Sequence, residues 1–225
     1  MKAQVKLGRI AGISIGLHYS WFIIALLIAL SLVQHFRAVA PQWSSRVVWT
    51  AALVTSLLFF AALLLHELGH SLVAKTRGLR VRSITLFALG GVSQIETEAS
   101  DAKSEFWIAI VGPLTSLAIG LVLLGTAWIN GWKTGTDPAT PVISVLVWLG
   151  YINITLAGFN MIPGYPLDGG RVLRAVIWQC RPLDKGRRPG RPSRRFSIYP
   201  VGLISILRRR ELRRTVASVY RLVSA

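Results

Sequence analysis

The sequence predicts an all-α membrane protein with about four transmembrane helices and an interfacial β-hairpin between the second and the third. Three observations predict this fold class. Hydrophobic residues make up 52% of the 225-residue chain and charged residues only 16%, whereas about 25% is usual in soluble domains. The apolar residues gather in four runs, each close to the roughly 20 residues that cross a ~30 Å hydrocarbon core. Residues 80–96 instead contain two β-prone runs around a glycine pair.

The four apolar runs are predicted to be transmembrane helices. They cover residues 15–33, 47–74, 106–129 and 142–162. Tryptophans lie near the ends of several runs, as in the aromatic belts of membrane proteins. No small-residue cleavage site follows the first run, so we expect it to be a retained helix rather than a removed signal peptide.

The basic residues are distributed unevenly between the two sides that four helices define. The N-terminal arm, the segment between the second and third runs, and the C-terminal tail hold 23 of the 26 lysines and arginines, and the two other loops hold 3. Without the tail, the short segments still give 8 against 3. By the positive-inside rule, we expect a multi-pass protein of the cell (plasma or inner) membrane with both termini in the cytoplasm.

The segment between the second and third runs is predicted to form the hairpin. Residues 81–87 are β-prone and residues 92–96 alternate apolar and polar side chains, with Gly90 and Gly91 between them. A glycine pair between such runs suits a sharp reversal. Because an open strand edge cannot face lipid, we expect the hairpin at the membrane interface or against the interior of the protein.

The segment His66-Glu67-Leu68-Gly69-His70 is the candidate metal site, near the cytoplasmic end of the second predicted helix. Histidines four residues apart share one helix face and can grip one ion. Bound Zn²⁺ lowers the pKa of its water towards ~7, and Glu67 can then act as the general base. Ionisable residues deep in a membrane helix are costly and indicate function. The alternative is a structural, hydrogen-bonded histidine pair.

Catalytic zinc usually has three protein ligands, so a third is expected elsewhere. Cys180 is the only cysteine, which leaves histidines and carboxylates. Asp168 is the strongest candidate because it follows a proline- and glycine-rich stretch at the cytoplasmic end of the fourth run. Irregular backbone at membrane depth is tolerated where it lines a cavity. On spacing alone, a plain turn in which Asp168 caps a helix starting near Arg171 is equally compatible.

Together these motifs resemble the site-2 protease family of intramembrane zinc metalloproteases. The resemblance rests on HELGH in one helix and on Asn160-x-x-Pro163-x-x-Pro166-Leu167-Asp168-Gly169 in a later one. Residues 12–20, the Gly90-Gly91 pair and residues 112–116 also match, so that the resemblance covers roughly residues 8–176. It implies a site-2-protease-like membrane metalloprotease domain at residues 1–176, in a short prokaryotic-type member with an atypical C-terminal region.

By this resemblance, His66, His70 and Asp168 match the ligands of one Zn²⁺ per chain, and Glu67 matches the catalytic base. Asn160 matches a family asparagine that contacts the substrate or stabilises the oxyanion. His18 also matches a family histidine, for which we expect an interfacial or packing role rather than a further ligand.

The resemblance also implies a function. The family hydrolyses peptide bonds in transmembrane or membrane-proximal segments of membrane proteins, in regulated intramembrane proteolysis. The cleavage often frees a regulator, such as a fragment of an anti-sigma-factor-like single-span protein. In this family the hairpin helps to present an unwound substrate strand near the metal. The predicted mechanism is Glu67-assisted attack of a zinc-bound water.

Residues 177–225 differ in composition from the rest of the chain. They are basic, and residues 181–195 are rich in proline and glycine, which predicts a disordered or interfacial cytoplasmic tail. Attraction to anionic lipid headgroups is the preferred interpretation. No reader motif supports a specific nucleic-acid partner. A truncation or an out-of-frame change is a third interpretation of the abrupt composition.

Two other classes of function stay open. The first is a catalytically impaired family member that acts as a membrane binding or scaffold protein. The atypical tail, in place of the further helices of many relatives, favours it, and the intact ligands and Glu67 oppose it. A metal transporter or metallochaperone needs polar residues along a whole path, and the sequence shows one compact site.

Overall fold

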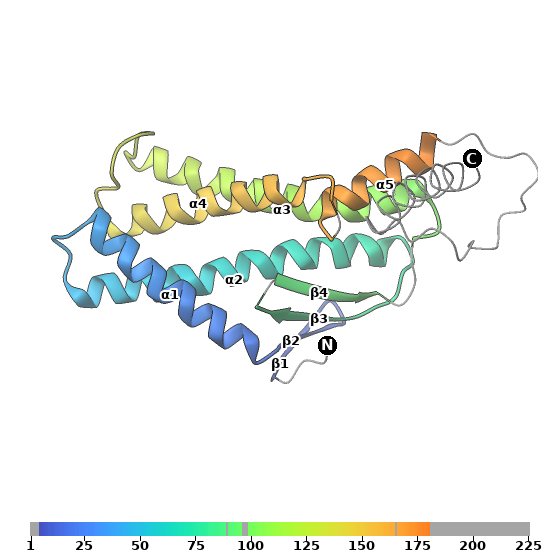
Figure 1. Cartoon of the computed structure of the whole chain (residues 1–225), viewed down its shortest axis with the longest axis horizontal. Coiled ribbons are helices and arrows are strands. Elements are labelled where there is room, and N and C mark those ends of the chain that lie inside the picture. The colour runs from blue at the N-terminus through green and yellow to red at the C-terminus, as the bar shows by residue number, and fades with distance from the viewer. Residues whose placement is uncertain (1–4, 89, 96–98, 165, 181–225) are drawn as a thin grey trace, which may run out of the picture. The chain divides into compact units, whose positions relative to one another are not determined.

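The structure is a computed structural model, and it describes residues 5–88, 90–95, 99–164 and 166–180. The strands of this part are β1 (Val5–Ile10), β2 (Ile13–Leu17), β3 (Val81–Phe87) and β4 (Gly90–Ile95). Its helices are α1 (Ser20–Val39), α2 (Ser45–Thr76), α3 (Ala102–Ile129), α4 (Pro141–Asn160) and α5 (Asp168–Cys180) (Figure 1). The predicted tail lies outside the described residues from residue 181 onward, and the predicted domain boundary at residue 176 stays a prediction.

Helices α1 to α4 are long and apolar enough to cross a membrane, which confirms the four predicted helices. The side chains of Ser44, Asp101 and Thr140 accept backbone N–H groups at the starts of α2, α3 and α4, and such caps stabilise helix ends. Large apolar side chains such as Val122 and Ile129 are exposed. Exposed apolar surface of this kind is expected where lipid is the solvent.

The prediction that the first helix begins at residue 15 is wrong. Ile13–Leu17 forms strand β2, and α1 begins only at Ser20. β2 is hydrogen-bonded on both edges, antiparallel to β1 and parallel to β3. Ile13, Ile15 and Leu17 are buried. The hydropathy of this segment therefore reflects a buried strand in a sheet rather than the first turn of a membrane helix.

The four strands form one sheet in the order β1-β2-β3-β4. The predicted hairpin between α2 and α3 is β3–β4, whose register pairs Phe87 with Gly90. The reversal thus comes before the glycine pair, because β4 already begins at Gly90. The β1–β2 hairpin was not predicted. It turns at Ala11 and Gly12, whose φ angles of 51° and 80° are both left-handed, as two-residue hairpin turns require.

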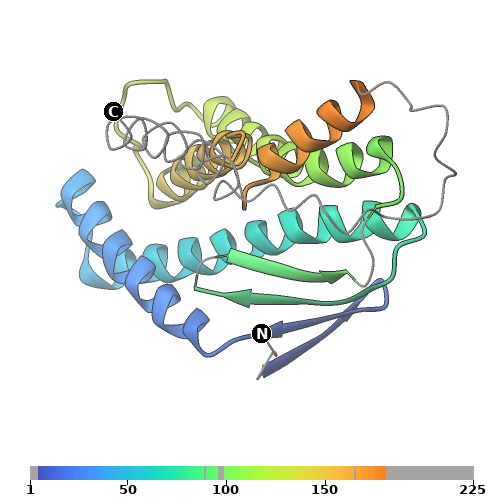
Figure 2. The same cartoon turned by 45° about the vertical axis from the view of Figure 1, so that its right-hand side comes forward.

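Helix α2 lies between the sheet on one side and α3 and α4 on the other, as both views show (Figures 1 and 2). Leu68 of α2 packs with Ile13, Leu17, Ile84 and Leu86 of the sheet in one apolar cluster. A second cluster joins α1 and α2. The central position of α2 brings its histidines and Glu67 between two groups of packing elements.

Close helix contacts fix α3 against α4. A Cβ at Gly120 would lie 2.7 Å from Cγ1 of Ile154, and one at Gly150 would lie 2.6 Å from Cγ of Leu124. Small residues at such crossings let membrane helices approach closely. Helix α5 in turn packs along α3, so α3 has contacts with every other helix that contributes to the site.

Candidate metal centre

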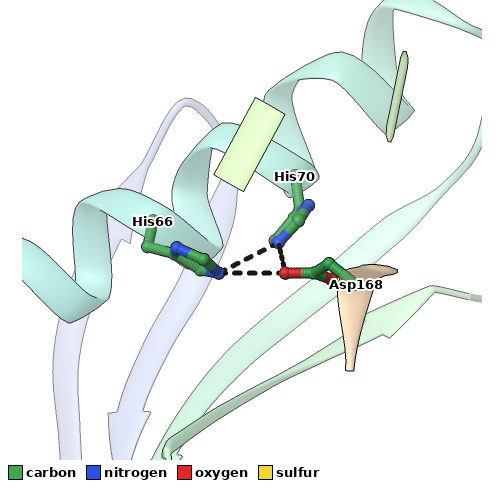
Figure 3. A group of neighbouring side chains, drawn as sticks. All are labelled: His66, His70 and Asp168. Atoms are coloured by element: carbon green, nitrogen blue, oxygen red, sulfur yellow. Dashed lines mark hydrogen bonds and ion pairs between the residues drawn. The ribbon is translucent and has the colours of Figure 1, made fainter. Parts of the chain in front are cut away.

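Three side chains from two distant segments converge beside α2. His66 and His70 lie one turn apart on α2, with residue exposures of 3% and 4%. Their Nε2 atoms lie 3.2 Å apart. Oδ2 of Asp168, from the first residue of α5, lies 3.2 Å from Nε2 of His66 and 3.1 Å from Nε2 of His70 (Figure 3). The predicted trio is therefore brought together, although 98 residues separate Asp168 from His70.

Asp168 does not lie on the fourth membrane helix. Helix α4 ends at Asn160, and Asp168 opens the separate helix α5, three residues before the predicted helix start at Arg171. Gly169 makes this arrangement feasible, because a Cβ at that position would overlap the backbone carbonyl of Met161. The irregular stretch after α4 thus allows the chain to turn back and direct the carboxylate at the two histidines.

The geometry of the three donor atoms fits a zinc ion. Two ligands about 2.0–2.1 Å from a tetrahedral Zn²⁺ lie about 3.3 Å apart, close to the three distances in this cluster. Among the described residues, His66, His70 and Asp168 are the side chains whose donor atoms lie close enough together to hold one metal ion. Two imidazole nitrogens and a carboxylate leave one tetrahedral position open, as in catalytic rather than structural zinc sites.

The other ring nitrogen of each histidine is bound by α3. Nδ1 of His70 lies 2.6 Å from the carbonyl oxygen of Ile108, and Nδ1 of His66 lies 2.9 Å from Oγ of Ser116. A carbonyl only accepts hydrogen bonds, so His70 carries its proton on Nδ1 and its Nε2 lone pair faces the cluster. Such outer partners orient the ligands of metal sites.

The proton balance of the cluster also points to a cation. With Nδ1 of His70 protonated, a neutral His70 directs the Nε2 lone pair at Oδ2 of Asp168 and at Nε2 of His66. Two hydrogen-bond acceptors that face each other do not attract unless a proton or a metal ion lies between them. Asp168 is the acidic member of the cluster and supplies its negative charge.

Glu67 is held from the sheet side. Oγ of Ser93, on β4, donates a hydrogen bond to Oε2 of Glu67 at 3.1 Å, and it lies 3.0 Å from Oγ of Ser71 on α2. A Cβ at Gly91 would overlap Cγ of Glu67. Strand β4 therefore packs directly on this side chain, and the glycine is required for the close approach.

The two remaining predicted site residues lie in different surroundings. Nδ2 of Asn160 donates to the carbonyl of Leu156, within its own helix, at 3.1 Å. Nδ1 of His18 lies 2.8 Å from Oγ of Ser20, just before α1. Neither contact joins the cluster of His66, His70 and Asp168. The roles of Asn160 and His18 stay predictions.

Sequence reasoning missed the residues that orient the site. Ser116 enters the sequence analysis only within the matching segment 112–116, and Ser71 and Ser93 are not singled out there. One signal was present, because Gly112 and Ser116 are four residues apart on one face of a membrane helix. Ile108 gave no signal, since it contributes only its main-chain carbonyl.

The fold and the donor set define a multi-pass membrane protein with a buried group of side chains suited to holding a metal ion. The sequence model of peptidase family M50 matches residues 54–132 and 129–188, more than half of the chain. This chain therefore belongs to peptidase family M50, the site-2 protease family.

Individual relatives agree with this membership. Protein sll0528 of Synechocystis sp. is 41% identical over 181 residues, which cover 80% of this chain and 45% of that protein. Rip3 of Mycobacterium tuberculosis is 39% identical over 180 residues, with the same coverage. Both are provisionally named zinc metalloproteases, which agrees with zinc as the metal. The chain thus spans about half the length of these relatives.

The fold also matches a solved structure. The site-2 protease from Methanocaldococcus jannaschii is 31% identical, with a TM-score of 0.51, and the match covers 80% of this chain and 74% of that one. This likeness confirms the predicted class of fold, a helical membrane domain with four long apolar helices and a small sheet.

Proposed function

We propose that this chain is an intramembrane zinc metalloprotease that hydrolyses peptide bonds in transmembrane or membrane-proximal segments of other membrane proteins. The observation that carries the proposal is the convergence of Nε2 of His66, Nε2 of His70 and Oδ2 of Asp168 within 3.2 Å of one another. This triangle stands next to Glu67, in a helix long and apolar enough to cross a membrane.

In this proposal His66, His70 and Asp168 hold one zinc ion. When bound, zinc supplies a Lewis acid that makes water acidic enough to react near neutral pH and polarises the peptide carbonyl. Ser116 and the carbonyl of Ile108 keep the two imidazoles oriented. The buried position of both histidines excludes bulk water from their rings.

Glu67 is the general base. Ser93 donates to Oε2 of Glu67, which leaves Oε1 to accept a proton from the attacking water. The water oxygen bonds to the peptide carbonyl carbon, the C–N bond breaks, and Glu67 passes the proton to the leaving amine. Ser93, which is in turn bonded to Ser71, thus orients the carboxylate during both transfers.

The substrate is expected to bind in an extended conformation beside β4. Strand β4 is the last in the order of the described sheet and pairs with β3, so its other edge has backbone groups that can pair with an added strand. A helical substrate segment must therefore unwind before cleavage. Asn160, at the end of α4, is proposed to contact the substrate or the developing oxyanion.

The proposed partners are a membrane-protein substrate, such as an anti-sigma-factor-like single-span protein, and membrane lipids. No specific nucleic-acid partner is proposed. The excess of basic residues on one side supports a cytoplasmic location for both termini. His66 and His70 lie in the last turns of α2, just before the basic segment 75–105, so the active site is proposed near the cytoplasmic side.

The decisive test compares the wild type with Glu67→Gln in proteoliposomes that contain a single-span membrane substrate. Loss of a general base lowers the rate by about 100- to 10,000-fold, whereas bound zinc, measured by atomic emission, should stay at one per chain. The matched control is Asp137→Asn, which neutralises an exposed carboxylate in the loop between α3 and α4. Equal cleavage by Glu67→Gln and the wild type would exclude the mechanism.

The proposed orientation is testable with the native thiol. Cys180 is the only cysteine and is exposed at the end of α5. A membrane-impermeant maleimide should label it in inverted vesicles and not in intact spheroplasts. The reverse labelling would contradict the cytoplasmic location of this end of the domain.

A further inference from the structure

One face of α3 contacts both histidines of the metal centre without contributing a donor atom to it. Glu105, Ile108, Gly112 and Ser116 are spaced by three, four and four residues, so they share that face. Ile108 and Ser116 orient His70 and His66, and Gly112 makes room for both rings. Glu105 has no part in the proposed reaction.

Glu105 is a buried carboxylate, with 3% of its side chain exposed. A buried carboxylate without partners would be strongly destabilising. Its Oε1 atom instead accepts from Nε of Arg171 at 3.1 Å and from Nη2 of Arg174 at 2.6 Å. Both arginines belong to α5, one turn apart, so two guanidinium groups of one helix meet a single carboxylate oxygen of another.

Asp168 lies on the same helix as these arginines. Residues 168 and 171 are three apart, and 171 and 174 are again three apart, so all three occupy neighbouring positions on one side of α5. One and the same rotation of α5 about its axis therefore lets both arginines reach Glu105 and directs Asp168 at the two histidines.

Apart from Asp168 itself, whose position is to be explained, the other described side-chain anchors of α5 are apolar or steric. Ala175 is buried, and Gly169 packs against the end of α4. Leu173, Val176, Ile177 and Trp178 are each 44–45% exposed. Apolar burial is non-directional, whereas hydrogen bonds to a guanidinium have defined geometry. The contacts to Glu105 therefore carry the orientation of the helix.

We propose that Glu105, acting through Arg171 and Arg174, is a positioning residue that holds Asp168 at the metal centre. This inference rests on the proposed function, because it concerns the third ligand of the same zinc site. Helix α3 then orients all three ligands: His66 through Ser116, His70 through Ile108, and Asp168 through the ion pair. Zinc affinity should depend on a carboxylate that does not contact the metal.

The test uses the full chain in detergent micelles and measures binding of the metal alone. Zinc dissociation constants come from competition with a chromophoric chelator, and Co²⁺ replaces zinc for absorption spectra that report coordination geometry. Arg174→Gln should weaken zinc binding by about 10- to 100-fold, as is typical when an outer partner of a ligand is lost. Its Co²⁺ spectrum should shift away from that of the wild type.

Arg174 is the preferred site because its side chain is 44% exposed, so we expect its substitution to disturb the fold less than that of the buried Glu105. Arg174→Lys keeps the charge and should recover most of the affinity and the wild-type spectrum. Glu105→Gln should weaken binding at least as much as Arg174→Gln. The double variant should be no weaker than Glu105→Gln alone, because both substitutions break one interaction. The matched control is Asp101→Asn, which also neutralises a carboxylate, at the N-cap of α3 and four residues before Glu105.

The outcomes separate this inference from the proposed function. If Arg174→Gln and Glu105→Gln have the zinc affinity and the Co²⁺ spectrum of the wild type, the positioning role is overturned. The metal site itself then stays intact. A wild-type chain that binds no zinc would overturn the metal site itself, and the positioning role with it. Weakening by Asp101→Asn equal to that by Glu105→Gln would also count against a specific role of the ion pair.

Discussion

Gly112 of α3 faces the imidazole of His70 so closely that a Cβ at residue 112 would overlap Nε2 of that ring. The same Cβ would lie 2.8 Å from Nε2 of His66. The glycine therefore sits against both of the nitrogen atoms that face Asp168. Helix α3 can come this close to α2 because residue 112 has no side chain.

We expect Gly112→Ala to disrupt the metal centre. The added methyl group must displace one or both imidazoles, so zinc affinity in the chelator competition assay should fall by more than tenfold. Gly125→Ala is the matched control on the same helix, because a Cβ there meets nothing within 4 Å. The control should gain up to about 1 kcal/mol of helix propensity. Equal zinc affinity in the two variants would contradict the steric explanation.

Ser116→Ala should weaken zinc binding by about 10- to 100-fold, since His66 loses the partner of its Nδ1 atom. The matched control is Ser144→Ala. Ser144 is also buried in a membrane helix, but its Oγ has no hydrogen-bond partner among the described residues. Calorimetric zinc titration of both variants checks the prediction, and a larger loss in Ser144→Ala than in Ser116→Ala would refute it.

Gly91→Ala should slow proteolysis while zinc stays bound. Its Cβ would overlap Cγ of Glu67, so either the carboxylate or strand β4 must move. Bound zinc should remain at one per chain, because the contact involves no proposed ligand, and kcat should fall by at least tenfold. Val92→Ala, at an exposed position of the same strand, is the control. Loss of zinc from Gly91→Ala would show that the disturbance reaches the histidines.

The start of α3 should show a pH dependence. Hydrogen bonds from Ser104, above all from its backbone N–H at 2.9 Å, lower the pKa of Asp101. Because the pKa is lower in the folded state, this cap stabilises the fold above the ordinary pKa of Asp, about 3.9, and loses that effect as pH falls through the folded-state value.

Asp101→Asn keeps a side chain that can cap the helix but removes the titration. Thermal unfolding of both proteins between pH 6 and pH 3 should therefore show a difference that shrinks at the acidic end. A difference that stays constant over this range would mean that Asp101 does not titrate with a lowered pKa.

Much of the fold was predictable from local sequence. Four runs of about 20 apolar residues predict four helices because the bilayer fixes the length of a spanning element. The grouping of the three side chains was predictable only in part. His66 and His70 are costly residues in an apolar helix, whereas spacing alone left Asp168 as a ligand or as a plain helix cap, and the family resemblance singled it out.

The elements that failed prediction depend on distant partners. Residues 13–17 have the hydropathy of a membrane helix, and only pairing with β1 and β3 makes them a strand. The carbonyl of Ile108 is common to every residue type, so its bond to His70 leaves no trace in the sequence. The pairing of Glu105 with two arginines of α5 likewise required the packing of α3 against α5.

The parallel pairing of β2 with β3 constrains how the chain threads the bilayer. β2 precedes α1 and β3 follows α2, so the two strands meet only if the intervening chain crosses and returns. An odd number of crossings would leave them on opposite faces of the membrane. The sheet can therefore close only when α1 and α2 cross the membrane as a pair, so the pairing that holds β4 against Glu67 depends on correct insertion of both helices.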